Sequence, residues 1–110
     1  MNYLSNALSL GMLDCLADGS VRLECTQISL HDATVWAGLH VWQSIVGHDD
    51  TALLFTSLLG HSVQARRVST SLAPGDVVLV GQYNGPRLPE GATALPEGAK
   101  IRWILVEVAQ

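Results

Sequence analysis

Ile45-Val46-Gly47-His48-Asp49-Asp50-Thr51-Ala52 is the stretch that decides the fold, because a strand changes into a helix within it. The apolar residues before Gly47 close a strand predicted over His40–Val46. Two acids suit the first turn of a helix, an apolar stripe runs on to Leu59, and Gly60 is a typical helix end. A helix is therefore predicted over Asp49–Leu59, with His48 at its start.

Outward from this helix, alternating apolar and polar residues predict further strands, and Ser29 with Asp32 predicts a capped second helix. The elements expected before His40 are a strand at Asn2–Leu8, an irregular or partly helical segment at Ser9–Gly19, a half-buried strand at Val21–Ile28 and a helix from Ser29 to Leu39. Those expected after Gly60 are an alternating strand at Arg67–Leu72, a turn at Pro74-Gly75-Asp76, a central strand at Val77–Gln82, a long loop from Asn84 to Lys100 and a strand at Ile101–Val108.

These elements predict one α/β domain over residues 1–110, with a mixed sheet of about five strands flanked by two to three helices. Charged residues make up only 15% of the chain and hydrophobic residues 48%, with a mean hydropathy of +0.28. A surface with so few charged residues favours a homodimer that covers an apolar face. The net charge of −4 argues against binding long nucleic acid but allows a small anion held by a few arginines.

Cysteine usage and hydropathy set the expected compartment. Cys15 and Cys25 have no metal-ligand spacing and fit reduced thiols of a cytoplasmic protein. The start of the chain lacks an export pattern, and no apolar run approaches the length of a membrane span. We therefore expect no membrane partner.

His48 is the first candidate for chemistry, because helix N–H groups and the helix dipole favour a phosphate beside its imidazole. The alternative is that His48 is only a polar cap and that the acids after it form a solvated first turn. A metal site is disfavoured, since the other histidines share no helical face with His48. Those histidines are His31, His40 and His61.

Two arginine segments offer cations for a phosphate. Arg87 and Glu90 lie in a loop that Pro86 and Pro89 stiffen, although a solvated proline turn with two incidental charges explains the same pattern. Arg66 and Arg67 also suit phosphate oxygens, because the guanidinium presents a planar fork. Of this pair, we interpret Arg66 as a surface charge that answers nearby acids.

Four segments together resemble the viral ring nucleases, anti-CRISPR proteins that degrade the cyclic tetra-adenylate made by type III CRISPR systems. In chain order they are Tyr3-Leu4-Ser5-Asn6-Ala7-Leu8-Ser9, Val46-Gly47-His48-Asp49-Asp50-Thr51-Ala52, Arg67-Val68 and Arg87-Leu88-Pro89-Glu90-Gly91. The resemblance spans nearly the whole chain. It implies a cytoplasmic homodimer, with the cyclic tetranucleotide bound across the interface and cut without a metal ion.

By this resemblance, a ribose 2′-hydroxyl attacks its own phosphate and leaves linear di-adenylate with a 2′,3′-cyclic phosphate end. His48 would be the general acid for the departing 5′-oxygen, Arg87 would contact the scissile phosphate, and Glu90 would position or tune His48. The residues implied to line the ligand pocket are Asn6, Ser9, Arg67 and Gln82. No metal ligand and no cofactor are implied.

Two other functions stay open at this stage. A binding module that only sequesters a cyclic oligonucleotide would need the arginines and the pocket, but not His48 with Glu90. A small dimeric interaction protein without a nucleotide ligand would fit the lean surface, yet it leaves the ordered polar motifs without a purpose.

Overall fold

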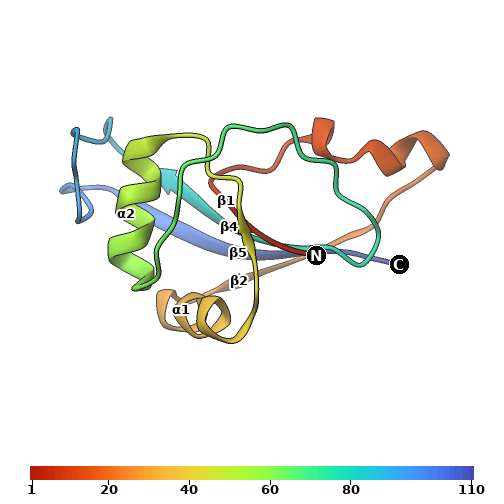
Figure 1. Cartoon of the computed structure of the whole chain (residues 1–110), viewed down its shortest axis with the longest axis horizontal. Helices are drawn as coiled ribbons and strands as arrows, with labels where there is room; N and C mark the ends of the chain where they lie inside the picture. The colour runs from red at the N-terminus through yellow and green to blue at the C-terminus, as the bar shows by residue number, and fades with distance from the viewer.

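The computed structural model describes the backbone of residues 1–110 and every side chain except that of Asp18. A five-stranded sheet forms its centre, in the order β2-β5-β4-β1-β3 (Figure 1). The strands are β1 (Asn2–Ser5), β2 (Leu23–Ile28), β3 (Gln43–Ser44), β4 (Val77–Asn84) and β5 (Lys100–Val108). The helices are α1 (Leu30–Leu39) and α2 (Asp49–Leu59), preceded by the short 3₁₀ turns η1 (Leu10–Met12) and η2 (Asp14–Asp18).

The sheet is mixed, as its sequence pattern predicts. β4 lies in the middle, antiparallel to β5 and parallel to β1, and β1 is also parallel to β3. β2 pairs with β5 alone and forms one edge. An apolar run that is buried on both faces is typical of a central strand, which explains why Val77–Gln82 was correctly predicted there.

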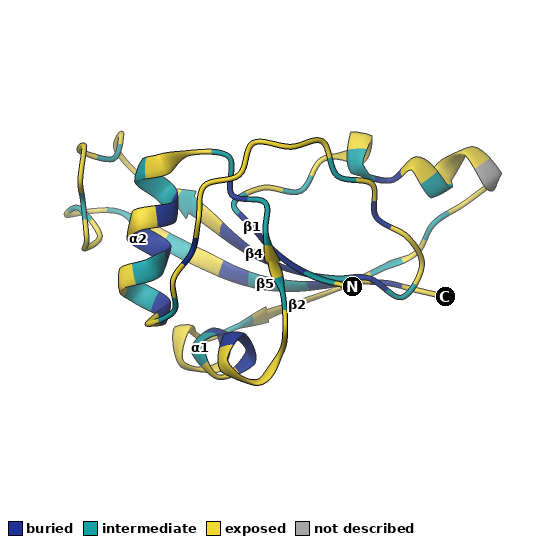
Figure 2. Cartoon of the chain, in the orientation of Figure 1, coloured by how far each residue is buried: buried dark blue, intermediate teal, exposed yellow. Residues whose placement is uncertain are grey.

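Each face of the sheet has its own core. On one face α1 and α2 pack over Leu4, Leu79 and Trp103, with Trp36 and Phe55 contributed by the helices. On the other face Leu13 and Leu72, from η1–η2 and the segment before β4, cover Val78 and Val106. Figure 2 shows buried residues along the sheet and on the inner sides of both helices. The covering of the second face leaves the ends of β4 and β5 nearest the β4–β5 loop open.

The helix boundaries follow local chemistry. The Ser29 side chain accepts a hydrogen bond from the backbone N–H of Asp32 at 3.0 Å, so the predicted cap of α1 is confirmed. Gly60 ends α2 in the left-handed conformation with φ of 72°, which glycine adopts without a Cβ penalty. The helix predicted over Asp49–Leu59 is therefore correct at both ends.

Three strand predictions were too long. β1 stops at Ser5, because the Ser5 hydroxyl turns back to the backbone of Ala7 and both donates to its C=O and accepts from its N–H. The strand predicted over His40–Val46 shortens to Gln43–Ser44, with one isolated bridge between Val46 and Ala65. The strand predicted from Val21 begins at Leu23, and as an edge strand it is mostly exposed rather than half-buried.

The strand predicted over Arg67–Leu72 is wrong. Only Ala65, just before it, bridges to a neighbour, and the residues from Arg66 to Ser69 are exposed and irregular. Alternating polarity indicates a strand only where one side of the segment meets a core. Here Leu72 alone reaches the core, and the preceding side chains border a cavity instead.

Candidate functional site

His48 occupies the N-cap position of α2 but its side chain makes no capping hydrogen bond. Its backbone carbonyl accepts from the N–H of Ala52 at 3.0 Å, which begins the helix, while the imidazole stays exposed. The polar-cap alternative therefore does not describe the imidazole. The ring is available to a ligand at a helix start, where unpaired N–H groups gather.

Hydrogen bonds from three segments hold the backbone that leads into His48. The Asn6 side chain accepts from the N–H of Gly47 at 3.2 Å, and the N–H of Arg66 donates to the carbonyl of Val46 at 2.7 Å. Ser44 donates its hydroxyl to the carbonyl of Gln64 and accepts from the N–H of Val46. Segments far apart in sequence thus converge on the residues before His48.

A cavity of about 500 Å³ opens at this convergence, and we call it the cationic pocket. It lies between the end of β1, the turn of η1, the residues before α2 and the segment after Ala65. Its lining is Ser5, Asn6, Ala7, Ser9, Gly11, Met12, Ile45, Gly47, His48, Arg66, Arg67, Val68, Ser69 and Thr70. This lining holds two arginines and four hydroxyl side chains but no Asp or Glu among the residues whose side chains are described.

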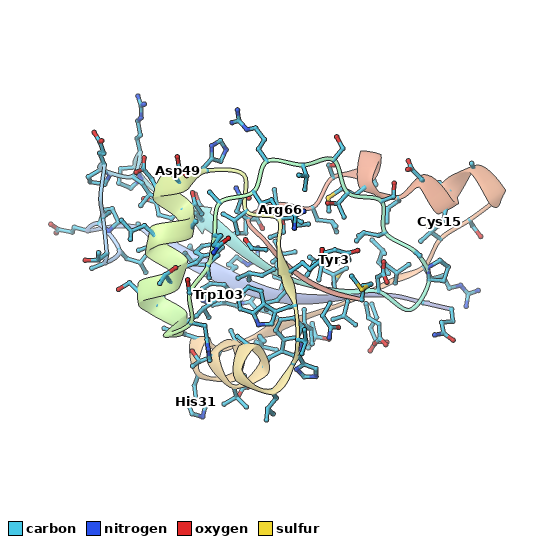
Figure 3. All side chains as sticks on the ribbon, viewed as in Figure 1. Tyr3, Cys15, His31, Asp49, Arg66 and Trp103 are labelled. Carbon is cyan, nitrogen blue, oxygen red and sulfur yellow. The ribbon has the colours of Figure 1, made fainter. Side chains whose placement is uncertain are left out.

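The two arginines of the pocket are not paired with acids. Within the described part of the chain, the one ion pair joins the amino group of Met1 to Asp76, at 3.2 Å. Arg66 is exposed, as its interpretation as a surface charge predicts, but no acid forms an ion pair with it among the described residues. Figure 3 labels Arg66 beside the segment that joins α2 to β4, near the middle of the view.

A second, mostly apolar cavity of about 300 Å³ adjoins the first, and we call it the apolar pocket. It shares Asn6 and Ala7 with the cationic pocket and is also lined by residues of β2, β4 and β5. Its other lining residues are Leu8, Cys25, Val80, Gln82, Ile104 and Val106. The predicted residue Gln82 thus shares the apolar pocket with Asn6, which also lines the cationic pocket.

Sequence reasoning missed Cys25 and Ile104 as members of the apolar pocket. The strand register places them there, because Cys25 is opposite Val106 and Val80 is opposite Ile104. The alternation of each strand was visible in the sequence, but which strands are neighbours was not. Register between distant strands was the missing signal.

Arg87 and Glu90 lie apart from the cationic pocket. With Asp49, Asp50, Leu88 and Pro89 they line a cavity of about 560 Å³ beside the start of α2. In Figure 3 the loop that carries them and the label of Arg66 lie on opposite sides of α2 in the view. No hydrogen bond between Glu90 and His48 is present among the described side chains, so the implied role of Glu90 stays a prediction.

Asp49 and Asp50 connect the two regions. The N–H of Gly91 lies 3.5 Å from a carboxylate oxygen of Asp50, which fastens the loop to the first turn of α2. A smaller cavity of about 350 Å³ is lined by Gly47, His48, Asp49, Ala65 and Arg67 and shares Asp49 with the loop cavity. His48 and Arg67 therefore face both the cationic pocket and the side of the helix that leads toward Arg87.

The described residues contain neither a metal-binding cluster nor a membrane-spanning helix. No group of three or more His, Cys, Asp or Glu side chains gathers there as around a metal ion. Neither α1 nor α2, nor any other described helix, has the length and hydropathy to cross a bilayer.

With this geometry in place, comparison with known proteins identifies the family. The model of a family described as STIV B116-like matches residues 2–101. The chain belongs to the STIV B116-like family. Every candidate site residue, from Asn6 to Glu90, falls inside the matched range.

A solved structure of the same fold is B116 of Sulfolobus turreted icosahedral virus, the viral protein from which the family takes its name. The two chains superpose with a TM-score of 0.81 at 24% sequence identity, over 96% of this chain and 97% of the other. The predicted α/β fold with a five-stranded mixed sheet is therefore confirmed. Comparison with curated protein sequences finds no match.

Proposed function

We propose that this STIV B116-like chain is a metal-independent ring nuclease that cleaves cyclic tetra-adenylate. A homodimer would bind the ring across its interface and release linear di-adenylate with 2′,3′-cyclic phosphate ends. The observation that carries the proposal is the cationic pocket, where His48 stands at a helix start beside two unpaired arginines. In a cell with a type III CRISPR system, this activity would remove the second messenger.

The charge distribution supports a phosphate ligand. The chain has 10 acidic residues against 6 Lys and Arg, yet two of those six line a cavity whose described lining contains no carboxylate. Arginine and hydroxyl groups are common phosphate-binding side chains, and a helix start adds N–H groups of the right polarity.

The apolar pocket supports a nucleotide rather than a bare anion. Its walls are aliphatic, which suits the flat face of a base, and two amide side chains, Asn6 and Gln82, stand in its lining. Asn and Gln pair well with the adenine edge, because they offer one donor and one acceptor side by side. Since Asn6 also lines the cationic pocket, base and phosphate would lie next to each other as in one nucleotide.

The proposed reaction needs no nucleophile from the protein. The ribose 2′-oxygen forms a bond to its neighbouring phosphorus and the bond from phosphorus to the 5′-oxygen breaks. The 2′-hydroxyl proton passes to solvent, and His48 donates a proton to the departing 5′-oxygen. Arg67 shares the small cavity with His48 and would offset the charge that grows on the phosphate.

Two protomers complete the site in this proposal. A two-fold axis would present two copies of His48 to opposite sides of the ring, so that two cuts give two di-adenylates. Arg87 and Glu90 would reach a phosphate from the loop fastened to Asp50, on the side of α2 that faces the small cavity. The lean, weakly charged surface supports the burial of a face between protomers.

Chromatography of the reaction products tests the proposal. Purified protein is incubated with cyclic tetra-adenylate in excess EDTA, and His48→Ala serves as the matched control. Di-adenylate with a cyclic phosphate end, formed by the unaltered protein and not by the variant, is the expected result. Binding without product would favour the sequestering module instead. If the protein neither binds nor cleaves cyclic tetra-adenylate, the proposed ligand is refuted.

A further inference from the structure

The lining of the cationic pocket, which has a volume of about 500 Å³, extends beyond His48 and Arg67. His48 and Arg67 line both this pocket and the small cavity beside Asp49, whereas Arg66 lines the cationic pocket only. The two neighbouring arginines therefore share the cationic pocket but differ beside the start of α2. There Arg67 lines the small cavity with His48, and Arg66 does not.

Ser69 and Thr70 line the same pocket and follow Arg66 closely in an irregular segment. The Arg66 guanidinium has no carboxylate in the described lining to neutralise it, and the two hydroxyls are neutral hydrogen-bond donors beside it in the lining. The backbone of this segment is anchored where it begins, because the N–H of Arg66 donates to the carbonyl of Val46 at 2.7 Å. A cation and two hydroxyls on an anchored segment suit a phosphate.

We infer that Arg66, with Ser69 and Thr70, forms a second phosphate site for a phosphate that is not cleaved. The ligand's identity rests on the proposed function, while the site itself rests on the lining of the pocket. A ring of four phosphates that lies across a two-fold axis gives each protomer two of them. One would be cut beside His48 and Arg67, and Arg66 would hold the other.

Binding measurements in a His48→Ala background test this site without interference from cleavage. Calorimetric titration with cyclic tetra-adenylate compares Arg66→Gln with Arg22→Gln, which removes the same charge from an exposed arginine outside the cationic pocket. We expect Arg66→Gln to weaken binding about tenfold or more, the usual cost of a charged hydrogen bond, and to lower the salt slope by about one. Arg22→Gln should change the affinity less than about twofold.

Equal affinities for the Arg66→Gln and Arg22→Gln variants would overturn the inference and leave the proposed function standing. If the His48→Ala protein does not bind the ring at all, the proposed function fails, and inorganic pyrophosphate becomes the probe. Amide NMR shifts at Arg66, Ser69 and Thr70 that disappear in Arg66→Gln would then support the site. Absent shifts, or shifts that persist in the variant, would overturn it.

Discussion

The side-chain oxygen of Asn6 accepts a hydrogen bond from the backbone N–H of Gly47, 3.2 Å away and 41 positions along the chain. This contact joins the end of β1 to the residue before His48. Asn6 also lines both the cationic and the apolar pocket. One side chain therefore fixes the approach to the proposed acid and borders the space for base and phosphate.

Replacing Asn6 separates its two roles. Asn6→Ala loses the bond to Gly47, which we expect to cost about 1 kcal/mol of unfolding free energy, or about 4 °C in Tm. Asn6→Asp keeps an acceptor for the N–H of Gly47 but brings a carboxylate into the pocket. The Tm should therefore stay unchanged, while the affinity for cyclic tetra-adenylate should fall. Calorimetry of both variants checks this. An Asn6→Asp protein that binds normally would contradict an anionic ligand in the pocket.

His48→Ala should abolish cleavage and leave binding largely intact. A general acid acts late, on the leaving oxygen, so its removal lowers the rate by roughly 10²- to 10⁴-fold without removing a ground-state contact of similar value. Single-turnover rates and affinities for cyclic tetra-adenylate measure the two effects. Cleavage at the unaltered rate would show that the acid is a different group.

The roles of Arg67 and Arg87 separate by comparison of two alanine variants. Both should weaken binding and cleavage, because both cations are proposed to approach a phosphate. The Arg67→Ala variant is expected to lose more of the chemical step, since Arg67 alone of the two lines a cavity with His48. Single-turnover kinetics at saturating ligand compares them. A larger loss of rate in the Arg87→Ala variant would mean that the loop moves to His48 when ligand binds.

A substitution at Gly81 tests how closely α2 packs on β4 beside the pocket residue Gln82. A Cβ added at Gly81 would lie 2.5 Å from a ring carbon of Phe55 and 2.6 Å from one of Trp103. Gly81→Ala should therefore destabilise the fold by about 1–3 kcal/mol through overpacking. Gly47→Ala is the matched control, because nothing lies within 4 Å of its added Cβ. Chemical denaturation of both variants checks this, and equal midpoints would contradict the packing of α2 on β4.

The sequence predicted the fold well wherever local chemistry decides the structure. Ser29, Gly60 and the apolar stripe of α2 act within one or two helical turns, so their effects can be read directly. The strand expected over Arg67–Leu72 was wrong for the opposite reason. The alternation of Arg67–Leu72 resembles that of Val21–Ile28. Only the tertiary neighbours show that Val21–Ile28 contains a strand paired with β5, whereas Arg67–Leu72 borders a cavity.

The candidate site was predicted in part for the same physical reason. Asn6, Ser9, His48 and Arg67 were expected together, and they do line one pocket. Arg66 was predicted to be a surface charge and is exposed, but its place in the pocket lining was not predicted, because that place depends on which distant segments are its neighbours. The loop of Arg87 and Glu90 was expected near His48, and it lies beside Asp49 and Asp50, the two residues that follow His48, but outside the lining of the cationic pocket. Long-range loop placement has no local signal in the sequence.

Cys25 offers a chemical probe of the apolar pocket. Its thiol is exposed and lines that pocket, whereas Cys15 is half-buried and lines a different cavity. In a Cys15→Ser background, saturating cyclic tetra-adenylate should slow the alkylation of Cys25 by iodoacetamide about tenfold or more, because a bound base would cover the sulfur. The second-order rate constant, followed by mass spectrometry, gives the comparison.

The matched control is Cys25→Ser, in which Cys15 alone reacts and its rate should not change with ligand. Because Cys25 is small and lines the proposed base site, the reverse experiment is also informative. Protein alkylated at Cys25 should lose affinity for the ring while keeping its Tm within about 2 °C, a shift expected for a surface change of under 0.5 kcal/mol. Equal alkylation rates with and without ligand, in protein shown to bind the ring, would place the base outside the apolar pocket and leave the phosphate sites as the only contacts of the proposal.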